Sequence, residues 1–153
     1  MNCSSQEVRR ILAQHDRIVL TAHVSPDGDA IGSLLAMQEW LEGLGKEVVV
    51  AVDDDIDDKF FFLPLAEQIR RPDQVQADAS WLTVVLDATG MDRIGAAEAL
   101  AKGKVLNIDH HISNLHFADW EYVRTDCAAT GEILTELLDD WQAGFSPSMA
   151  NAL

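Results

Sequence analysis

The chain has 153 residues, of which 48% are hydrophobic, and its formal net charge at neutral pH is −15. This length and hydrophobic content are those of one folded domain with a real core, which excludes a disordered tail. The negative charge argues against a protein that holds duplex nucleic acid on a broad basic surface, and no apolar run is long enough to cross a bilayer.

The N-terminal stretch and the two cysteines predict a cytoplasmic protein that does not associate with a membrane. The chain begins MNCSSQEVRR, which lacks the basic-then-apolar pattern of a secretory signal. Cys3 and Cys127 do not form a metal-binding spacing, so we expect reduced thiols rather than a metal site or a disulfide.

Four short apolar runs predict buried strands. They are residues 17–23, 47–52, 82–88 and 104–109. Longer segments with helical spacing separate several of them. Continuous apolar strands alternating with helices predict an α/β fold, in which a parallel β-sheet is flanked by helices on both faces in a Rossmann-like arrangement.

Three other segments have the patterns of helices. Residues 30–45 place apolar side chains at helical spacing and end at Gly43 or Gly45, and residues 128–144 predict an amphipathic helix capped near Thr130. In the last helical segment, Ser146 is the expected N-cap and Pro147 the first helical residue. The acidic run at 53–58 predicts a solvated loop.

Ionisable residues gather where three of the predicted strands end. The first strand is followed by His23, Asp27 and Asp29, the strand at 82–88 contains Asp87, and the strand at 104–109 leads into Asp109, His110 and His111. Pro26 and Gly28 around Asp27 predict a tight turn. Because ligand sites in open α/β sheets form beyond the carboxyl ends of the strands, we expect these side chains to converge.

The residue types in this cluster favour a pair of catalytic metal ions. Imidazoles and carboxylates without thiolates suit Mn, Zn, Fe or Mg better than a structural zinc site. Asp27 and Asp29 can each reach a different ion, and Asp87 can bridge the two. Ions about 3.5–4 Å apart are common in enzymes that split phosphate esters, where they activate water and stabilise developing charge.

Each group taken alone has an ordinary structural explanation. His23 could be a hydrogen-bonded core histidine, Asp27 a turn residue and Asp87 a helix cap. The coincidence of all three groups at one predicted edge argues for a site instead. His15 and His116 have no such neighbours, and we expect them to be surface or structural residues.

Three segments resemble the DHH phosphoesterase superfamily, and most closely the bacterial group of bifunctional oligoribonucleases and 3′-phosphoadenosine-5′-phosphate (pAp) phosphatases, the RecJ-like nanoRNases. The segments are HVSPDGDAIGS at 23–33, VVLDATGMDRIG at 84–95 and NIDHHISNLHF at 107–117. The stretch AATGEIL at 128–134 also resembles a helix start in that group. The resemblance covers essentially the whole chain.

The resemblance implies a Mn-dependent phosphoesterase that uses a metal-bound hydroxide as its nucleophile. The implied metal ligands are His23 and Asp27 for one Mn ion, Asp29 and His110 for the other, and Asp87 as the bridge. His111 would contact the phosphate or assist proton transfer. Asp109 would orient a histidine or support the loop. The implied substrates are short single-stranded RNA or DNA oligonucleotides, or small nucleotides such as pAp.

The resemblance also implies a domain arrangement. Residues 1–153 would form the N-terminal catalytic domain, which in the family is followed by a fourth motif with another metal-binding aspartate and by a C-terminal substrate-binding domain. Relative to that pattern the chain ends before both parts, so we expect weak or no activity from it alone. The sequence leaves the oligomeric state open, a homodimer included.

Several alternatives remain open from the sequence. Within the superfamily these are a RecJ-type single-strand exonuclease, a cyclic dinucleotide phosphodiesterase and a family II inorganic pyrophosphatase. Outside enzymes, the same fold could serve as a nucleotide-binding regulatory module. The intact set of predicted ligands favours an enzyme.

Overall fold

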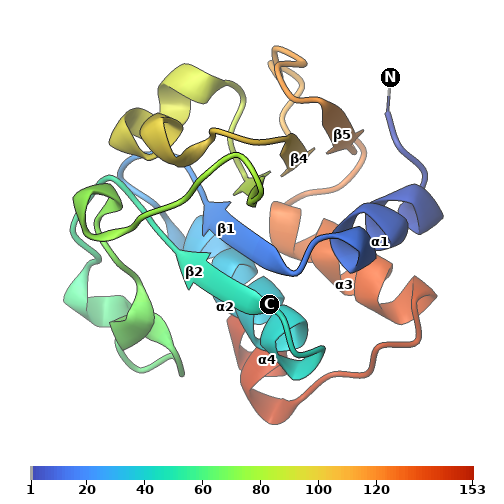
Figure 1. Ribbon diagram of the computed structural model, residues 1–153. Helices are drawn as coiled ribbons and strands as arrows, with labels where there is room; N and C mark the ends of the chain where they lie inside the picture. Colours follow the sequence, from blue (N-terminus) through green and yellow to red (C-terminus); the bar gives the residue numbers. More distant parts are fainter. Residues whose placement is uncertain (1) are drawn as a thin grey trace.

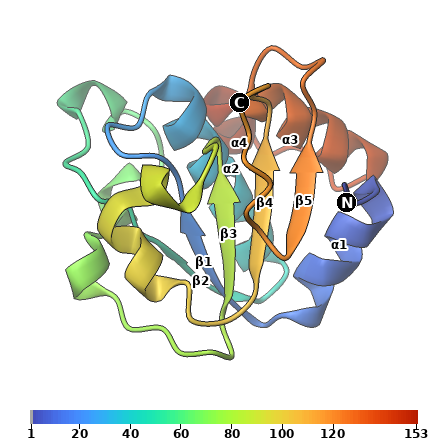
Figure 2. The ribbon, with the colours of Figure 1, turned by 90° about the horizontal axis from the view of Figure 1, so that it is seen from above.

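A parallel β-sheet forms the centre of the computed structural model, which describes residues 2–153 (Figures 1 and 2). Its five strands lie in the order β2-β1-β3-β4-β5, and every neighbouring pair is parallel. The strands are β1 (Arg17–Thr21), β2 (Glu47–Val50), β3 (Leu82–Leu86), β4 (Val105–Asp109) and β5 (Trp120–Val123). The predicted parallel α/β fold is confirmed.

The four predicted strands correspond to β1 to β4, whereas β5 has no counterpart among the predicted strands. This edge strand has only four residues, and its side chains alternate between half-buried and buried. Short edge strands with one open side lack the continuous apolar run that marks the central strands.

Helices cover both faces of the sheet (Figure 2). The α-helices are α1 (Ser5–Gln14), α2 (Gly28–Gly43), α3 (Thr130–Asp140) and α4 (Pro147–Ala152), and the 3-10 helices are η1 (Asp58–Phe60), η2 (Ala66–Gln68), η3 (Pro72–Gln74) and η4 (Met91–Leu100). The α-helices share one hydrophobic core with alternate strand residues such as Leu20, Val84 and Ile108. The opposite face, which includes Val19 and Val85, packs against η4 and the segment before β3.

The ends of the helices follow from local sequence. Ser146 caps α4 by accepting a hydrogen bond from the backbone N–H of Met149, and Pro147 is the first residue, as predicted. Helix α2 ends at Gly43, and Gly45 adopts a positive φ of 80° just beyond it. Helix α1 was not predicted, although Ser4 and Glu7 form a capping box that the S-x-x-E spacing could have indicated.

The strand order creates a point where the chain changes direction across the sheet. After β1 the chain passes through α2 to β2 on one side, whereas β3 lies on the other side of β1. In sheets of this order, the carboxyl ends of β1 and β3 diverge into a crevice where ligands bind. Within residues 2–153, the structure contains no helix that is both long and apolar enough to cross a membrane.

Candidate active site

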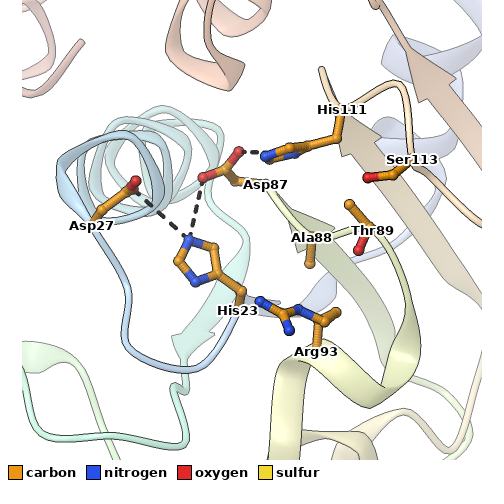
Figure 3. Close-up of a pocket in the computed structure, with 8 residues that line it drawn as sticks. All are labelled: His23, Asp27, Asp87, Ala88, Thr89, Arg93, His111 and Ser113. Carbon is orange, nitrogen blue, oxygen red and sulfur yellow. Dashed lines mark ion pairs between the residues drawn. The ribbon is translucent and has the colours of Figure 1, made fainter.

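The loops after β1, β3 and β4 bring the predicted residues to one edge of the sheet. One group of ligand atoms comes from His23, Asp27 and Asp87, and a second comes from Asp87, His110 and His111. Within each group these atoms lie within 4.8 Å of one another. Figure 3 shows His23 and His111 directed toward different oxygens of Asp87. Asp87 is therefore shared by the two groups.

The imidazole of His23 is oriented by its own loop. Its Nδ1 donates a hydrogen bond of 2.7 Å to the carbonyl of Val24, which leaves Nε2 facing the carboxylates. Nε2 lies 3.5 Å from Oδ2 of Asp87 and 3.8 Å from Oδ1 of Asp27. A backbone acceptor on one ring nitrogen fixes the tautomer in which the other nitrogen has a free lone pair, as a metal ligand requires.

Asp87 sits at the end of β3 in an unusual backbone conformation. Its φ is 55°, in the left-handed region that non-glycine residues rarely occupy. The side chain is almost fully buried, with Oδ2 facing His23 and Oδ1 facing Nε2 of His110 at 3.5 Å. Thr130 also donates a hydrogen bond of 3.0 Å to Oδ1. Strained backbone of this kind clusters at functional sites.

Contacts of Asp87 also shift ionisation at the site. Burial by itself would raise the pKa of Asp87, but the contacts with His23 and Thr130 outweigh it and hold the pKa below its ordinary value. The same contact with Asp87 raises the pKa of His23. A carboxylate that remains ionised in a buried position is suited to hold a cation.

Asp29 differs from the other predicted ligands because it also anchors α3. Its oxygens accept hydrogen bonds from the backbone N–H groups of Thr130 and Gly131, at 2.8 and 2.7 Å. Helix α3 was predicted to be capped near Thr130. It does begin there, but its N-cap residue Ala129 has no capping side chain, and Asp29 serves instead. Burial raises the pKa of Asp29 despite these donors.

The distance from Asp29 to the remaining cluster is short. Its Oδ2 lies 3.8 Å from Nε2 of His110, within the range that a shared ion would span. His111 nevertheless joins His110 and Asp87 in the second ligand group, the place predicted for Asp29. The Asp29 carboxylate is also held by the two N–H groups in the first turn of α3.

A buried polar network holds the imidazole of His111. Asp109 is fully buried, and its oxygens accept hydrogen bonds of 2.7 Å from Nδ1 of His111 and from Nδ2 of Asn114. Asn114 also donates to Asn107, whose own amide donates to the carbonyls of Val85 and Ala88. These contacts explain how a charged strand end is accommodated in the core.

A cavity of about 460 Å³ opens beside Asp87 (Figure 3). Asp27 and His23 lie on one side of it, and Thr89 and Ser113 lie on the other. Arg93 also lines the cavity. Arg93, Thr89 and Ser113 were not among the predicted site residues, although all three lie within the segments 84–95 and 107–117.

The acidic run at 53–58 is less solvated than predicted. Asp55, Asp57 and Asp58 are exposed, but Asp53 and Asp54 are half-exposed and fix neighbouring segments. Asp54 accepts hydrogen bonds from the backbone N–H and the hydroxyl of Ser25 in the loop after β1. Asp53 accepts from the backbone N–H of Ala96 in η4 and pairs with Arg71. Both carboxylates therefore hold loops that carry site residues.

The other ionisable candidates lie outside the site. Nδ1 of His15 lies 2.8 Å from the carbonyl of Ile11, and Nδ1 of His116 lies 2.7 Å from the buried carboxylate of Glu121. Both histidines thus have local structural partners. Cys3 and Cys127 carry free thiols.

The chemistry of the site fits divalent metal ions. The donors are imidazole nitrogens and carboxylate oxygens, the set that Mn, Fe, Zn and Mg accept. Two carboxylates and an imidazole converge around the cavity, and the unengaged Nε2 of His23 points at them. Without a cation these carboxylates would repel one another, so the arrangement favours binding of positive charge.

Comparisons with known proteins point to one family. The family model described as "DHH family, N-terminal domain" matches residues 17–153. The chain is 35% identical over 131 residues to the bifunctional oligoribonuclease and PAP phosphatase NrnA of Thermus thermophilus, a match that covers 82% of this chain and 39% of that protein. It is 27% identical to the Bacillus subtilis protein of the same name, with 86% and 41% covered. The chain therefore spans less than half the length of these relatives.

Two solved structures have a similar fold. An exopolyphosphatase-related protein from Bacteroides fragilis matches with a TM-score of 0.85 and 26% identity, covering 97% of this chain and 47% of that one. A putative family II inorganic pyrophosphatase from Methanococcus jannaschii matches with a TM-score of 0.65 and 17% identity, covering 88% and 45%. The second likeness concerns the fold alone.

Proposed function

The chain belongs to the DHH family, and we propose that it forms the N-terminal catalytic part of a Mn-dependent phosphoesterase. Its substrates would be short oligonucleotides or small nucleotides such as pAp, as the names of the curated relatives suggest. The observation that carries this proposal is the position of Asp87. Its two carboxylate oxygens face different histidines, each at 3.5 Å, so one side chain can serve two adjacent ions.

The proposed ligands divide around Asp87. His23 and Asp27 would hold the first ion, and His110 with Asp29 would hold the second. Bound ions of this kind lower the pKa of a coordinated water and neutralise charge on phosphate oxygens. Asp29 can still contribute while it anchors α3, because an ionised carboxylate has about four lone-pair sites and the helix uses two.

In this proposal His111 would move a proton at the cavity. Its Nδ1 donates to Asp109, so its Nε2 carries the lone pair in the neutral ring and is the atom that can accept a proton. Asp109 both fixes this tautomer and stabilises the imidazolium that forms. His111 lines the cavity beside Asp87, where a bound phosphate ester would lie.

The competing activities differ in substrate. A family II pyrophosphatase would act on pyrophosphate, a RecJ-type exonuclease on longer single strands and a cyclic dinucleotide phosphodiesterase on cyclic dinucleotides. A nucleotide-binding regulatory module would hydrolyse none of them. Curated relatives with 27–35% identity carry the oligoribonuclease and PAP phosphatase name, which favours the proposed substrates.

The test is a substrate panel on the full-length protein with and without Mn. We expect Mn-dependent hydrolysis of pAp and of very short RNA. Asp87→Asn should lower the rate of this hydrolysis by at least about a hundredfold, which is more than removal of a residue that only supports a metal ligand typically costs. Asp73→Asn, a change at an exposed residue of η3, is the matched control and should behave as the wild type. Full activity of Asp87→Asn, or turnover of pyrophosphate alone, would contradict the proposal.

A further inference from the structure

The wall of the cavity that includes Arg93 has no role in the proposed metal chemistry. Arg93, Thr89 and Ser113 line the same 460 Å³ cavity as Asp27 and Asp87. Cavities of this size hold ligands as large as a nucleotide. A phosphate ester held at the carboxylate side would therefore leave part of its structure beside these three residues (Figure 3).

Arg93 has the chemistry of an anion-binding residue. It is the only Lys or Arg among the residues that line this cavity, all of which belong to the described part of the chain. Within residues 2–153 its side chain forms no ion pair, even though two carboxylates line the same cavity. Its guanidinium thus remains available to a ligand, and guanidinium groups match phosphate oxygens in paired hydrogen bonds.

The backbone around Arg93 is held firmly in place. Its carbonyl accepts a hydrogen bond of 2.8 Å from Val24, next to His23, and its N–H donates to the carbonyl of Gly90. Two residues further along, Gly95 adopts a positive φ of 56°, and Ala96 donates to Asp53. The position of Arg93 is therefore tied to the loop that carries the first predicted metal ligand.

The segments that carry the two hydroxyl residues are joined by a backbone hydrogen bond. The carbonyl of Thr89 accepts a hydrogen bond of 2.8 Å from the N–H of Leu115, which joins the loop containing Ser113 to the end of β3. Their hydroxyls add neutral donors to the cavity that the guanidinium also lines. Such a combination suits an anion more than a nucleobase or an apolar group.

We infer that Arg93, Thr89 and Ser113 form a second phosphate subsite, which binds a phosphate group of the substrate other than the one that is cleaved. The preferred ligands are then phosphate esters with a second phosphate on the same or the adjoining sugar. This inference rests on the proposed function, because it assigns the carboxylate side of the cavity to the cleaved phosphate. It also gives this acidic chain, with a net charge of −15, a local means of retaining a highly anionic ligand.

The experiment compares binding of pAp with binding of adenosine 3′-monophosphate and adenosine 5′-monophosphate to the full-length protein. Calorimetry with Ca²⁺ in place of Mn²⁺ measures affinity while suppressing turnover. We expect the wild type to bind pAp at least about tenfold more tightly than either monophosphate, as one charge-assisted contact provides. Arg93→Gln should lose this preference. Its affinity for at least one monophosphate should change less than about twofold, because a monophosphate bound at the carboxylate side lacks the contact with Arg93.

Two further variants make the result specific. Arg93→Lys keeps the charge without the planar fork, so it should retain part of the preference. Arg9→Gln removes an equal charge from the exposed surface of α1 and should leave the preference unchanged. Equal affinities in the wild type, or an equal loss for all three ligands in Arg93→Gln, would overturn the subsite. An Arg93-dependent preference without any hydrolysis would reject the proposed function alone.

Discussion

The hydroxyl of Thr130 donates a hydrogen bond of 3.0 Å to Oδ1 of Asp87, and the backbone N–H of the same threonine donates to Asp29. Thr130 is fully buried at the first turn of α3, 43 residues from Asp87 in the chain. One residue therefore positions two of the proposed metal ligands from outside the Asp-His-His segment.

Removing this hydroxyl should weaken metal binding. Thr130→Val preserves the shape of the side chain but removes the donor to Asp87, and we expect Mn affinity to fall by about tenfold or more, as for other residues that orient metal ligands. Titration calorimetry of the full-length protein measures the change. Thr125→Val, at an exposed position in the loop before α3, is the control and should bind Mn normally. An unchanged Mn affinity in Thr130→Val would show that the Thr130 hydroxyl does not position the metal ligands.

Metal binding should also stabilise the fold. A ligand that binds only the folded state adds about 2.7 kcal/mol of stability at a concentration one hundred times its Kd. We therefore expect saturating Mn to raise the melting temperature by roughly 5–10 °C for a domain of this size, and a chelator to reverse the shift. Asp87→Asn should lose the shift and Asp73→Asn should keep it. A melting temperature that does not respond to Mn would argue that the site is not assembled.

The central strands and the edge that carries the site were predictable from the sequence because both depend on local patterns. Continuous apolar runs mark β1 to β4, and parallel strands necessarily deliver the residues after them to one edge. His23, Asp87 and His110 each follow such a run directly. Their convergence follows from chain direction and needs no knowledge of side-chain contacts.

The remaining features depend on contacts between distant segments. No local pattern reveals the partners of Asp53 and Thr130. Asp53 accepts a hydrogen bond from Ala96 and Thr130 donates one to Asp87, and both partners are distant in the chain. The capping of α3 by Asp29 was missed for the same reason, because the capping side chain lies more than 100 residues away. Spacing rules describe caps within one helix and cannot identify one supplied by another.

Gly95 should tolerate no side chain. Its φ is 56°, and a Cβ atom there would lie 2.4 Å from Oδ2 of Asp53 and 2.8 Å from Cγ1 of Val24. Gly95→Ala should therefore destabilise the fold by about 1–3 kcal/mol, the cost of a strained residue combined with a displaced hydrogen bond. Urea denaturation measures this. Gly43→Ala is the control, because its Cβ would meet nothing within 4 Å near the end of α2, and we expect unchanged or slightly higher stability.

Asp119 should contribute stability that depends on pH. It accepts hydrogen bonds from Nζ of Lys104 and from the backbone N–H of Val105 at the start of β4. Burial alone would raise the pKa of Asp119, but these donors outweigh it and hold the pKa below its ordinary value of 3.8. Because the pKa of Asp119 is lower in the folded state, the stabilisation is fully present above pH 3.8. It disappears as the pH falls through the pKa that Asp119 has in the folded protein.

Asp119→Asn should accordingly lower the free energy of unfolding at neutral pH by about 0.5–1 kcal/mol, the range expected for a partly exposed pair. Below the folded pKa of Asp119 the wild type loses the same charge, so the difference between the two proteins should shrink toward zero. Urea titrations with a chelator present, at neutral and strongly acidic pH, test this. A difference that persists undiminished in acid would show that lost packing, and not the charge, is responsible.

Asp109→Asn should damage both stability and the proposed proton transfer. Both oxygens of Asp109 accept from N–H donors, His111 on one side and Asn114 on the other. An asparagine amide must turn its own NH₂ toward one of them, which places two donors face to face in a fully buried position. We expect a loss of about 1–3 kcal/mol in the free energy of unfolding, the usual cost of an unsatisfied buried donor.

The effect on activity distinguishes a supporting role from a purely structural one. If Asp109 fixes the tautomer of His111, then Asp109→Asn should lower kcat and have a smaller effect on KM. In a His111→Gln background the same substitution should cause little further loss of kcat. Asp73→Asn in the same two backgrounds controls for the removed charge. Equal and additive losses in both backgrounds would mean that Asp109 acts on activity only through the stability of the loop, and not through the histidine beside it.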